Sequence, residues 1–255
     1  MHRVNIPPDV VERVIRHRGR EHVYDNFDPA KTALLVVDMQ NAFMMPGVAH
    51  VLCAEAINIV PNINRLAEAM RAAGGTVVWV VTTFGQASLE NWPVLHEMAG
   101  AERTPARIAA LAEGSVGHQL WTDLVVEPND LTIVKTKYSA FIQSSLEPTL
   151  RQRGIDTLLV TGTVTGVCCE STARDAMMRN FRTVMVTDAN AAMTDEDHNA
   201  SLRAFYLSFG DILSTDQIVA HLQTRRNATR RQAARRARPL TRKPAVAEQS
   251  RKETR

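Results

Sequence analysis

The sequence lacks the features that define several classes of protein. No apolar run among its 255 residues approaches the roughly 20 residues that a membrane-spanning helix needs. Residues 1–8 have no apolar core of the kind found in signal peptides. Its three cysteines, Cys53, Cys168 and Cys169, are too few for a disulfide framework. We therefore expect a soluble, cytoplasmic protein that does not associate with membranes.

Cofactor and metal signatures are also missing. The glycines of the stretch 162–166 lack the GxGxxG spacing of a dinucleotide loop, and no phosphate-binding GK[ST] motif occurs. The cysteines have no CxxC pattern, and His96, His118 and His198 have no spacing typical of metal ligands. The sequence therefore predicts neither a cofactor nor a metal ion.

The net charge of +3 hides two parts of opposite sign. Residues 224–255 contain 12 of the 30 Lys and Arg residues but only 2 of the 27 Asp and Glu residues. The remaining 223 residues are mildly acidic, with 18 basic and 25 acidic side chains. The overall sign is therefore no evidence that the whole chain handles nucleic acid, and only the tail offers that possibility.

Short apolar runs alternate with helical patterns over most of the chain, which predicts parallel strands joined by helices. The expected strands are residues 31–38, 76–82, 130–135, 157–161, 181–187 and 211–213. The expected helices are residues 57–73, 144–153, 167–180, 195–208 and 215–223. We expect one doubly wound, three-layer α/β/α domain with a mainly parallel sheet, in which sites form beyond the carboxyl ends of the strands.

This domain is predicted to span residues 30–223. Residues 1–29 form an N-terminal arm, either an amphipathic helix or a segment that docks on a neighbouring subunit. Residues 84–130 lack a clear pattern and are read as excursions over the sheet edge. Residues 224–255 have almost no large apolar side chain, which predicts disorder with transient helix across 225–238.

Cys168 and Cys169 follow an apolar strand and stand where a helix is expected to begin. Unpaired backbone N–H groups and the helix dipole at such a position favour a thiolate, the nucleophilic form of cysteine. The alternative is a small buried hydrophobic residue, which describes most free cysteines. About 100° of helical rotation separates the two side chains, so only one can face the end of the sheet.

Two charged residues end other expected strands. Asp38 closes the run 33–37, where a carboxylate has either a chemical task or a role in capping the next helix. Lys135 closes the run 131–134, although Lys137 competes for any role and an exposed lysine is the common alternative. Parallel topology would bring Asp38, Lys135 and Cys168 to one rim, where together they could catalyse acyl transfer.

Three segments resemble the conserved blocks of the isochorismatase-like cysteine hydrolases, in the same order and at matching spacing. They are Ala33-Leu-Leu-Val-Val-Asp-Met-Gln-Asn41, Lys135-Thr-Lys-Tyr-Ser-Ala-Phe141 and Gly162-Thr-Val-Thr-Gly-Val-Cys168 through Asp175. The resemblance covers about residues 30–222. It implies that Asp38 is the general base and later acid, Lys135 the orienting cation and Cys168 the nucleophile. It also implies that Cys169 is a core residue, at a position where the family usually has an aliphatic side chain.

The resemblance further implies a non-proline cis peptide at Thr163–Val164. The backbone N–H groups of Val164 and Cys168 would then form an oxyanion hole for the substrate carbonyl. Substrate contacts are assigned to Gln40, Phe43, Tyr138 and Phe141, whereas core packing is an equally open interpretation of each aromatic. Phe84 and Trp92 are further candidates for the pocket.

Differences within the resembling family narrow the expected substrate. Nicotinamidases of the family have an Asp/His metal cluster near the site, and residues 81–88 contain no histidine. Isochorismatase itself lacks the cysteine, so Cys168 argues against vinyl-ether hydrolysis. The sequence most resembles the ureidoacrylate and N-carbamoylsarcosine branch, although Gly166 stands where the family often has Asn or Asp. We expect a small amide or ureido substrate and, as is common in the family, a homo-oligomer.

Two alternatives stay open. The chain could be a hydrolase of the same family that acts on a different small substrate. It could also be a catalytically idle fold whose basic tail, residues 224–255, binds nucleic acid or acidic surfaces. A pure binding module has no need of Asp38, Lys135 and Cys168 together, which favours catalysis.

Overall fold

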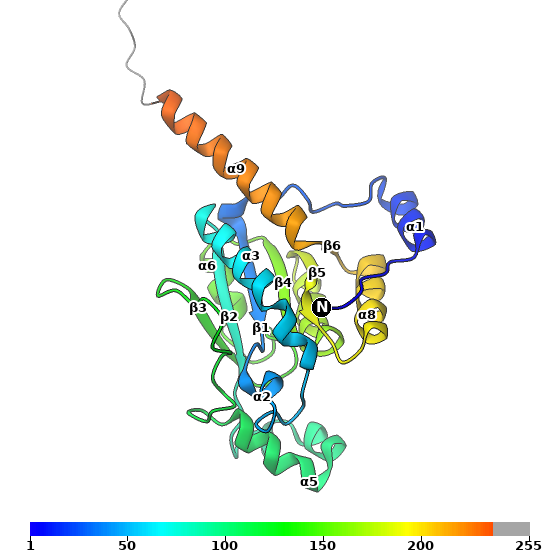
Figure 1. Cartoon of the computed structure of the whole chain (residues 1–255), viewed down its shortest axis with the longest axis vertical. Coiled ribbons are helices and arrows are strands. Elements are labelled where there is room, and N and C mark those ends of the chain that lie inside the picture. The colour runs from blue at the N-terminus through cyan, green and yellow to red at the C-terminus, as the bar shows by residue number, and fades with distance from the viewer. Residues whose placement is uncertain (237–255) are drawn as a thin grey trace, which may run out of the picture.

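A six-stranded parallel sheet forms the centre of the protein, with strand order β3-β2-β1-β4-β5-β6 (Figure 1). The computed structural model describes residues 1–236, with side chains up to Ala228. The strands are β1 (Thr32–Val37), β2 (Thr76–Thr82), β3 (Leu131–Lys135), β4 (Thr157–Thr163), β5 (Arg182–Ala191) and β6 (Asp211–Leu213). The predicted doubly wound α/β architecture is confirmed, because the order reverses between β1 and β4.

Helices cover both faces of the sheet and complete three layers. One face packs against α3 (Val60–Ala72) and α9 (Thr215–Arg236). The other face packs against α1 (Pro8–Arg18), α6 (Leu146–Gln152), α7 (Glu170–Met178) and α8 (Asp195–Ser208). The elements whose positions were predicted lie within a few residues of those positions, except for the C-terminal end of α9, which is discussed below.

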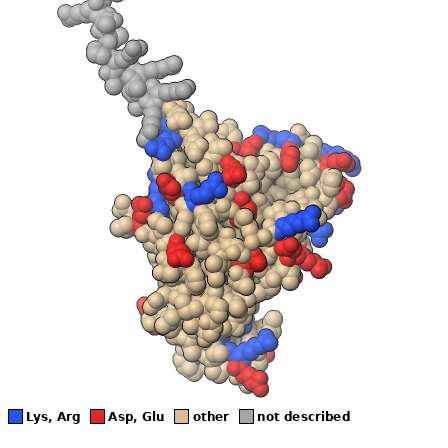
Figure 2. Space-filling model, in the orientation of Figure 1, with Lys and Arg blue, Asp and Glu red and all other residues tan. Residues whose placement is uncertain are grey.

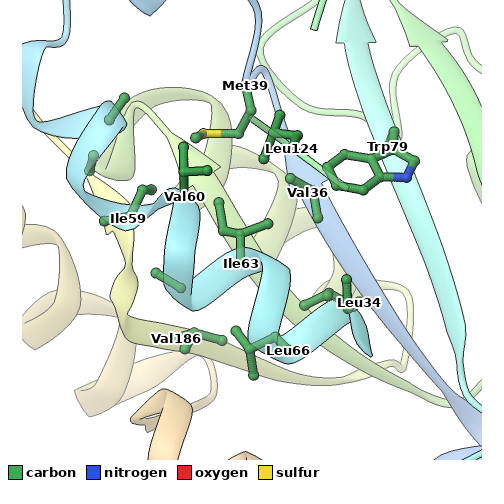
Figure 3. Packing of buried hydrophobic residues seen from close by; sticks show 14 of the residues in the cluster. Leu34, Val36, Met39, Ile59, Val60, Ile63, Leu66, Trp79, Leu124 and Val186 are labelled. Carbon is green, nitrogen blue, oxygen red and sulfur yellow. The ribbon is translucent and has the colours of Figure 1, made fainter. Parts of the chain in front are cut away.

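The central strand β1 is buried on both sides, as its unbroken apolar sequence predicts. Leu34 and Val36 point into the α3 layer, where they meet Ile63 and Leu66 (Figure 3). The intervening residues Ala33, Leu35 and Val37 belong to the core on the opposite face. A strand held in this way has a fixed register, so the residue that follows it has a fixed position.

The segment read from sequence as an excursion contains two helices, α4 (Ser88–Asn91) and α5 (Pro93–Leu111). The backbone of α5 is kinked at Gly100, and Pro105 lies within the helix, which explains why its pattern was weak. Together with α2 (Asn41–Met44), α5 lies beyond the carboxyl ends of the strands, at the bottom of Figure 1. This segment therefore builds one wall over the end of the sheet.

The C-terminal helix is longer than expected. The expected helix ended at Gln223 and was followed by a disordered tail with only transient helix across 225–238, whereas α9 is continuous to Arg236. Ala, Arg and Gln are good helix formers, so the composition of this segment favours a helix. The helix extends away from the sheet, toward the end of the molecule opposite α5 (Figure 1). The rest of the predicted tail, residues 237–255, lies outside the described residues.

None of the helices in the described part of the chain has the length and apolar character required to cross a membrane.

Candidate active site

Four neighbouring strands end in the polar residues of the site. Lys135 ends β3 and pairs in register with Thr82 at the end of β2. Asp38 directly follows β1, and Cys168 follows β4 after a short turn. Because these strands are adjacent in the order β3-β2-β1-β4, their ends bring the four side chains to one place.

Asp38 and Lys135 form a buried ion pair. The Nζ atom of Lys135 lies 2.7 Å from Oδ2 of Asp38, and both side chains are at most 1% exposed. Burial is the largest single effect and would lower the pKa of Lys135, but the charges and hydrogen bonds of Asp38 and Cys168 together outweigh it and raise that pKa overall. The lysine is therefore held as a cation inside the protein.

Thr82 joins the ion pair and was not predicted. Its hydroxyl donates to Oδ1 of Asp38 at 2.7 Å and accepts from Nζ of Lys135 at 2.5 Å. This bridge fixes both charged groups while leaving Oδ2 of Asp38 without a hydrogen bond among the described residues, apart from its ion pair. The strand-end argument that identified Asp38 and Lys135 applies equally to Thr82, which ends the strand between them.

Cys168 lies at the floor of a pocket, with its Sγ atom 3.5 Å from Nζ of Lys135. The residue belongs to a wide helical turn, η3 (Thr165–Cys169), that leads into α7. Burial raises the pKa of the thiol, the charge of Asp38 raises it further, and Lys135 acts in the opposite direction. The expected preference for a thiolate at a helix start is therefore wrong for this free site, because burial and the adjacent carboxylate dominate.

The other two cysteines are buried away from this contact. Cys169 is fully buried, and its Sγ atom faces the backbone oxygen of Thr161 at 3.8 Å. Cys53 is also fully buried and donates to the backbone oxygen of Ala192. All three cysteines are free thiols. Cys169 thus occupies the core position that the resemblance implied.

The peptide bond between Thr163 and Val164 is cis, as the resemblance implied. It lies between the end of β4 and the turn η3, and both Val164 and Cys168 line the pocket. The backbone groups assigned to an oxyanion hole are thus on the same wall as the sulfur.

The pocket has a volume of about 580 Å³ and is lined mainly by apolar side chains. Phe43 and Tyr138, two of the four predicted substrate contacts, line it, and so do Phe84 and Trp92. This volume suits a small molecule, and most of the lining around the charged groups is apolar.

Gln40 and Phe141 are not in the pocket lining. Gln40 is fully buried. Its amide nitrogen donates to the backbone oxygens of Thr82 and His118, and its amide oxygen accepts from the backbone N–H of Thr82. Phe141 packs in the core against Phe181, 5.7 Å between ring centroids. Their proximity in sequence to Asp38 and Lys135 was a poor guide, because the chain turns sharply after each strand.

Several polar residues of the pocket were not predicted. They come from α5, α7 and α8 and include Arg107, Glu170, Arg174 and Ser201. Arg174 binds Glu170, and Asp175 lies 3.4 Å from Arg179. Residues one helical turn apart face each other, so the spacing of four could have indicated both pairs.

Comparisons with known proteins agree with this geometry. The Isochorismatase domain matches residues 32–217. Ureidoacrylate amidohydrolase RutB of Methylobacterium radiotolerans is 35% identical over 196 residues, which cover 72% of this chain and 76% of that protein.

Two solved structures have the same fold. The crystal structure of a cysteine hydrolase from Pseudomonas syringae pv. phaseolicola is 28% identical and matches with a TM-score of 0.71, covering 78% of this chain and 96% of that one. N-carbamoylsarcosine amidase from Thermoplasma acidophilum is also 28% identical, with a TM-score of 0.60 over 73% of this chain and 97% of that one.

The chain has a doubly wound sheet with a pocket at the carboxyl ends of its strands, and an acid, a cation and a thiol lie at the floor of this pocket. Together with the relatives, these features define an enzyme of the hydrolase class. Two of these relatives are by name an amidohydrolase and an amidase, which act on carbon–nitrogen bonds. The chain belongs to the isochorismatase family.

Proposed function

We propose that the protein is a cysteine-dependent amidohydrolase that cleaves a C–N bond of a small amide or ureido compound through a thioester intermediate. The observation that carries the proposal is the contact of Lys135 with both Asp38 and Cys168 at the floor of a small-molecule pocket. The similarity to a ureidoacrylate amidohydrolase and an N-carbamoylsarcosine amidase supports the ureido or N-carbamoyl type of substrate.

The first step is attack by sulfur on the substrate carbonyl. Because the pKa of the Cys168 thiol is raised, its proton must leave as the S–C bond forms. Asp38 accepts it through Oδ2, whose contact among the described residues is the ion pair with Lys135. Lys135 stays charged and holds the carboxylate in position, and its charge also stabilises the developing thiolate.

The carbonyl oxygen becomes an oxyanion as the tetrahedral intermediate forms. The backbone N–H groups of Val164 and Cys168 stabilise it, an interaction often worth about 3 kcal/mol per donor. Asp38 then returns its proton to the leaving nitrogen, the C–N bond breaks, and ammonia or an amine departs. Water deprotonated by Asp38 finally hydrolyses the thioester, which restores the thiol and releases the acid.

The test is release of ammonia from a panel of small amides, ureido acids and N-carbamoyl compounds. The unmodified protein should hydrolyse at least one of them, and Cys168→Ala and Cys168→Ser should lose turnover by several orders of magnitude. The matched control is Cys169→Val, which replaces a buried core thiol by a somewhat larger apolar side chain and should stay folded and active. Full activity of Cys168→Ala, or loss of activity only in Cys169→Val, would show that sulfur 168 is not the nucleophile.

The remaining predictions concern location and partners. We propose a cytoplasmic homo-oligomer in which any binding of nucleic acid would involve only the basic segment 224–255. On the face shown in Figure 2, acidic and basic side chains of the described residues are interspersed, so this face has no extended basic surface. Salt-dependent nucleic-acid binding that disappears on removal of residues 224–255 would support the tail as a binder, without bearing on catalysis.

A further inference from the structure

Four cationic side chains line the pocket, and they are Arg107, Lys135, Lys137 and Arg174. Two of them have a carboxylate partner. Lys135 is paired with Asp38, and Arg174 forms an ion pair with Glu170 one helical turn away. The charges of these two cations are thus already compensated by the protein.

Lys137 is engaged in another way. Its Nζ atom donates to the backbone oxygen of Asn91 and lies 4.8 Å from the centre of the Trp92 ring. It therefore ties the chain after β3 to helix α4 at the edge of the pocket. Arg107 alone among these four cations has no hydrogen bond, ion pair or ring contact within residues 1–228.

Arg107 is not a freely solvated surface side chain. Its Nη1 atom is buried and has no hydrogen-bond partner in the described part of the protein. A buried donor without a partner destabilises a protein by about 1–3 kcal/mol, and a charged one by more. An acceptor on a bound ligand would remove this cost.

The two titratable side chains that Arg107 influences most clearly, His50 and Tyr138, are neutral. Burial, together with the charge of Arg107, lowers the pKa of His50 to about 4, so this imidazole is uncharged near neutrality. Its Nδ1–H donates to the backbone oxygen of Ala42. Burial raises the pKa of Tyr138, with Arg107 acting in the opposite direction, so the phenol is uncharged as well. No protein anion pairs with Arg107 in this part of the pocket.

The walls near Arg107 are apolar. Leu111 follows it by one helical turn on α5, and Phe84, Trp92 and Leu95 line the same pocket. Low polarity strengthens the attraction between a cation and an anion. A planar guanidinium also offers two parallel N–H groups that match the two oxygens of a carboxylate.

We propose that Arg107 binds a carboxylate of the substrate, and that the enzyme therefore acts on small ureido or N-carbamoyl acids rather than on neutral amides. The inference rests on the proposed function, because the scissile carbonyl lies at Cys168 while the carboxylate lies at Arg107. The residue is thus a determinant of specificity, which holds the far end of the substrate and takes no part in proton transfer.

The test compares an acid with its uncharged ester. Ammonia release is measured with N-carbamoyl-β-alanine and with its methyl ester, and the ratio of the two kcat/KM values is the readout. The unmodified enzyme should prefer the acid, and Arg107→Met should reduce the ratio about 10- to 100-fold, mainly through KM, as expected for loss of a charged hydrogen bond. Arg107→Lys keeps the charge but loses the planar fork, and should give an intermediate ratio.

The matched control is Arg103→Met. Arg103 is an exposed residue of the same helix that does not line the pocket, so the ratio should stay at the unmodified value. Calorimetric binding of N-carbamoyl-β-alanine to Cys168→Ser, with and without Arg107→Met, gives a second measurement that needs no turnover. Binding should be detected in the single variant and should weaken at least tenfold in the double variant.

Two results would overturn the assignment of Arg107. One is an acid-to-ester ratio that Arg107→Met leaves unchanged or that favours the ester in the unmodified enzyme. The other is a failure of the acid to bind Cys168→Ser, or binding that is equal in the double variant. Either result, with turnover still dependent on Cys168, would refute this inference alone. Turnover that survives in Cys168→Ser would instead refute the proposed function.

Discussion

The Nζ atom of Lys135 lies 2.7 Å from Oδ2 of Asp38, and neither side chain is accessible to solvent beyond 1%. A buried pair of this kind is stable only while both charges are present, because each one compensates the desolvation of the other. The pair therefore contributes both to the fold at the end of the sheet and to the proposed proton transfer.

Removing the charge of Lys135 should reduce both the stability of the protein and its catalytic activity. Lys135→Met leaves the Asp38 carboxylate buried without its partner, which we expect to lower the free energy of unfolding by about 3–5 kcal/mol. Turnover should be lost in the same variant. Urea denaturation and ammonia release measure the two effects.

The double variant Asp38→Leu with Lys135→Met separates the effect on stability from the effect on turnover. With both charges gone, stability should recover much of the loss, whereas activity should remain absent. A single variant as stable as the unmodified protein would contradict the assigned role of the buried pair.

Thr82 is expected to matter through its hydroxyl group. Thr82→Val keeps the shape of the side chain but removes both hydrogen bonds to the ion pair. We expect a loss of about 1–3 kcal/mol in unfolding free energy and a kcat reduced about 10- to 100-fold. Thr82→Ser retains the hydroxyl and should keep most of the activity, and equal kcat values for the two variants would argue against the bridge.

Gly162 allows β4 to approach β1 directly before the turn that contains Cys168. Its φ of +116° is unfavourable for other residues, and an added Cβ would lie 2.0 Å from the backbone oxygen of Val37. Gly162→Ala should therefore destabilise the protein by about 3 kcal/mol or more, as measured by denaturation.

Gly166 is the matched control for this substitution. It lies in the same turn, but an added Cβ would meet no atom closer than 3.7 Å, and its φ is not in the left-handed region. Gly166→Ala should change stability by less than about 1 kcal/mol. Similar losses in both variants would show that the close approach of the strands is not the cause.

The buried His198 should make the folding stability of the protein depend on pH. Its Nε2–H donates to the backbone oxygen of Thr187, so Nδ1 accepts from the Thr165 hydroxyl beside the site. Burial lowers the pKa of His198 to about 4, aided by the neighbouring His2, whereas a histidine in the unfolded chain titrates near 6.5.

Between these two values the unfolded chain binds a proton that the folded protein does not. Stability should therefore fall as the pH drops from about 6.5 to about 4, by up to about 3 kcal/mol from this residue. His198→Asn, which cannot titrate, should show a shallower slope, while His50, with a similar pKa, still contributes in both proteins. An unchanged slope would show that His198 is not responsible.

The sequence predicted the parts of the site that depend on regular structure. Asp38 and Lys135 end strands with clear apolar patterns, so the parallel sheet determined where they lie. Thr82 also ends a strand, but it carries no charge that would have distinguished it in the sequence. The protonated state of Cys168 could not be predicted, because burial and the distance to Asp38 are properties of the tertiary structure.

Residues outside the sheet were harder to predict. Arg107 lies on a helix interrupted by Gly100 and Pro105, so its sequence gave no indication of which face meets the pocket. Gln40 and Phe141 were assigned to the substrate from proximity along the chain, whereas the turns after β1 and β3 direct them into the interior. A short turn can change the direction of the chain within two or three residues, and the local sequence rarely specifies where the following side chains point.

The most direct test of the account is to identify the covalent intermediate. The enzyme is mixed with an N-carbamoyl substrate that it hydrolyses, quenched in acid during turnover, digested and analysed by mass spectrometry. A carbamoyl adduct on the sulfur of Cys168, absent in Cys168→Ser and retained in Cys169→Val, is the predicted result. An adduct on Cys169 or Cys53, or undiminished turnover in Cys168→Ser with no adduct on any cysteine, would contradict it.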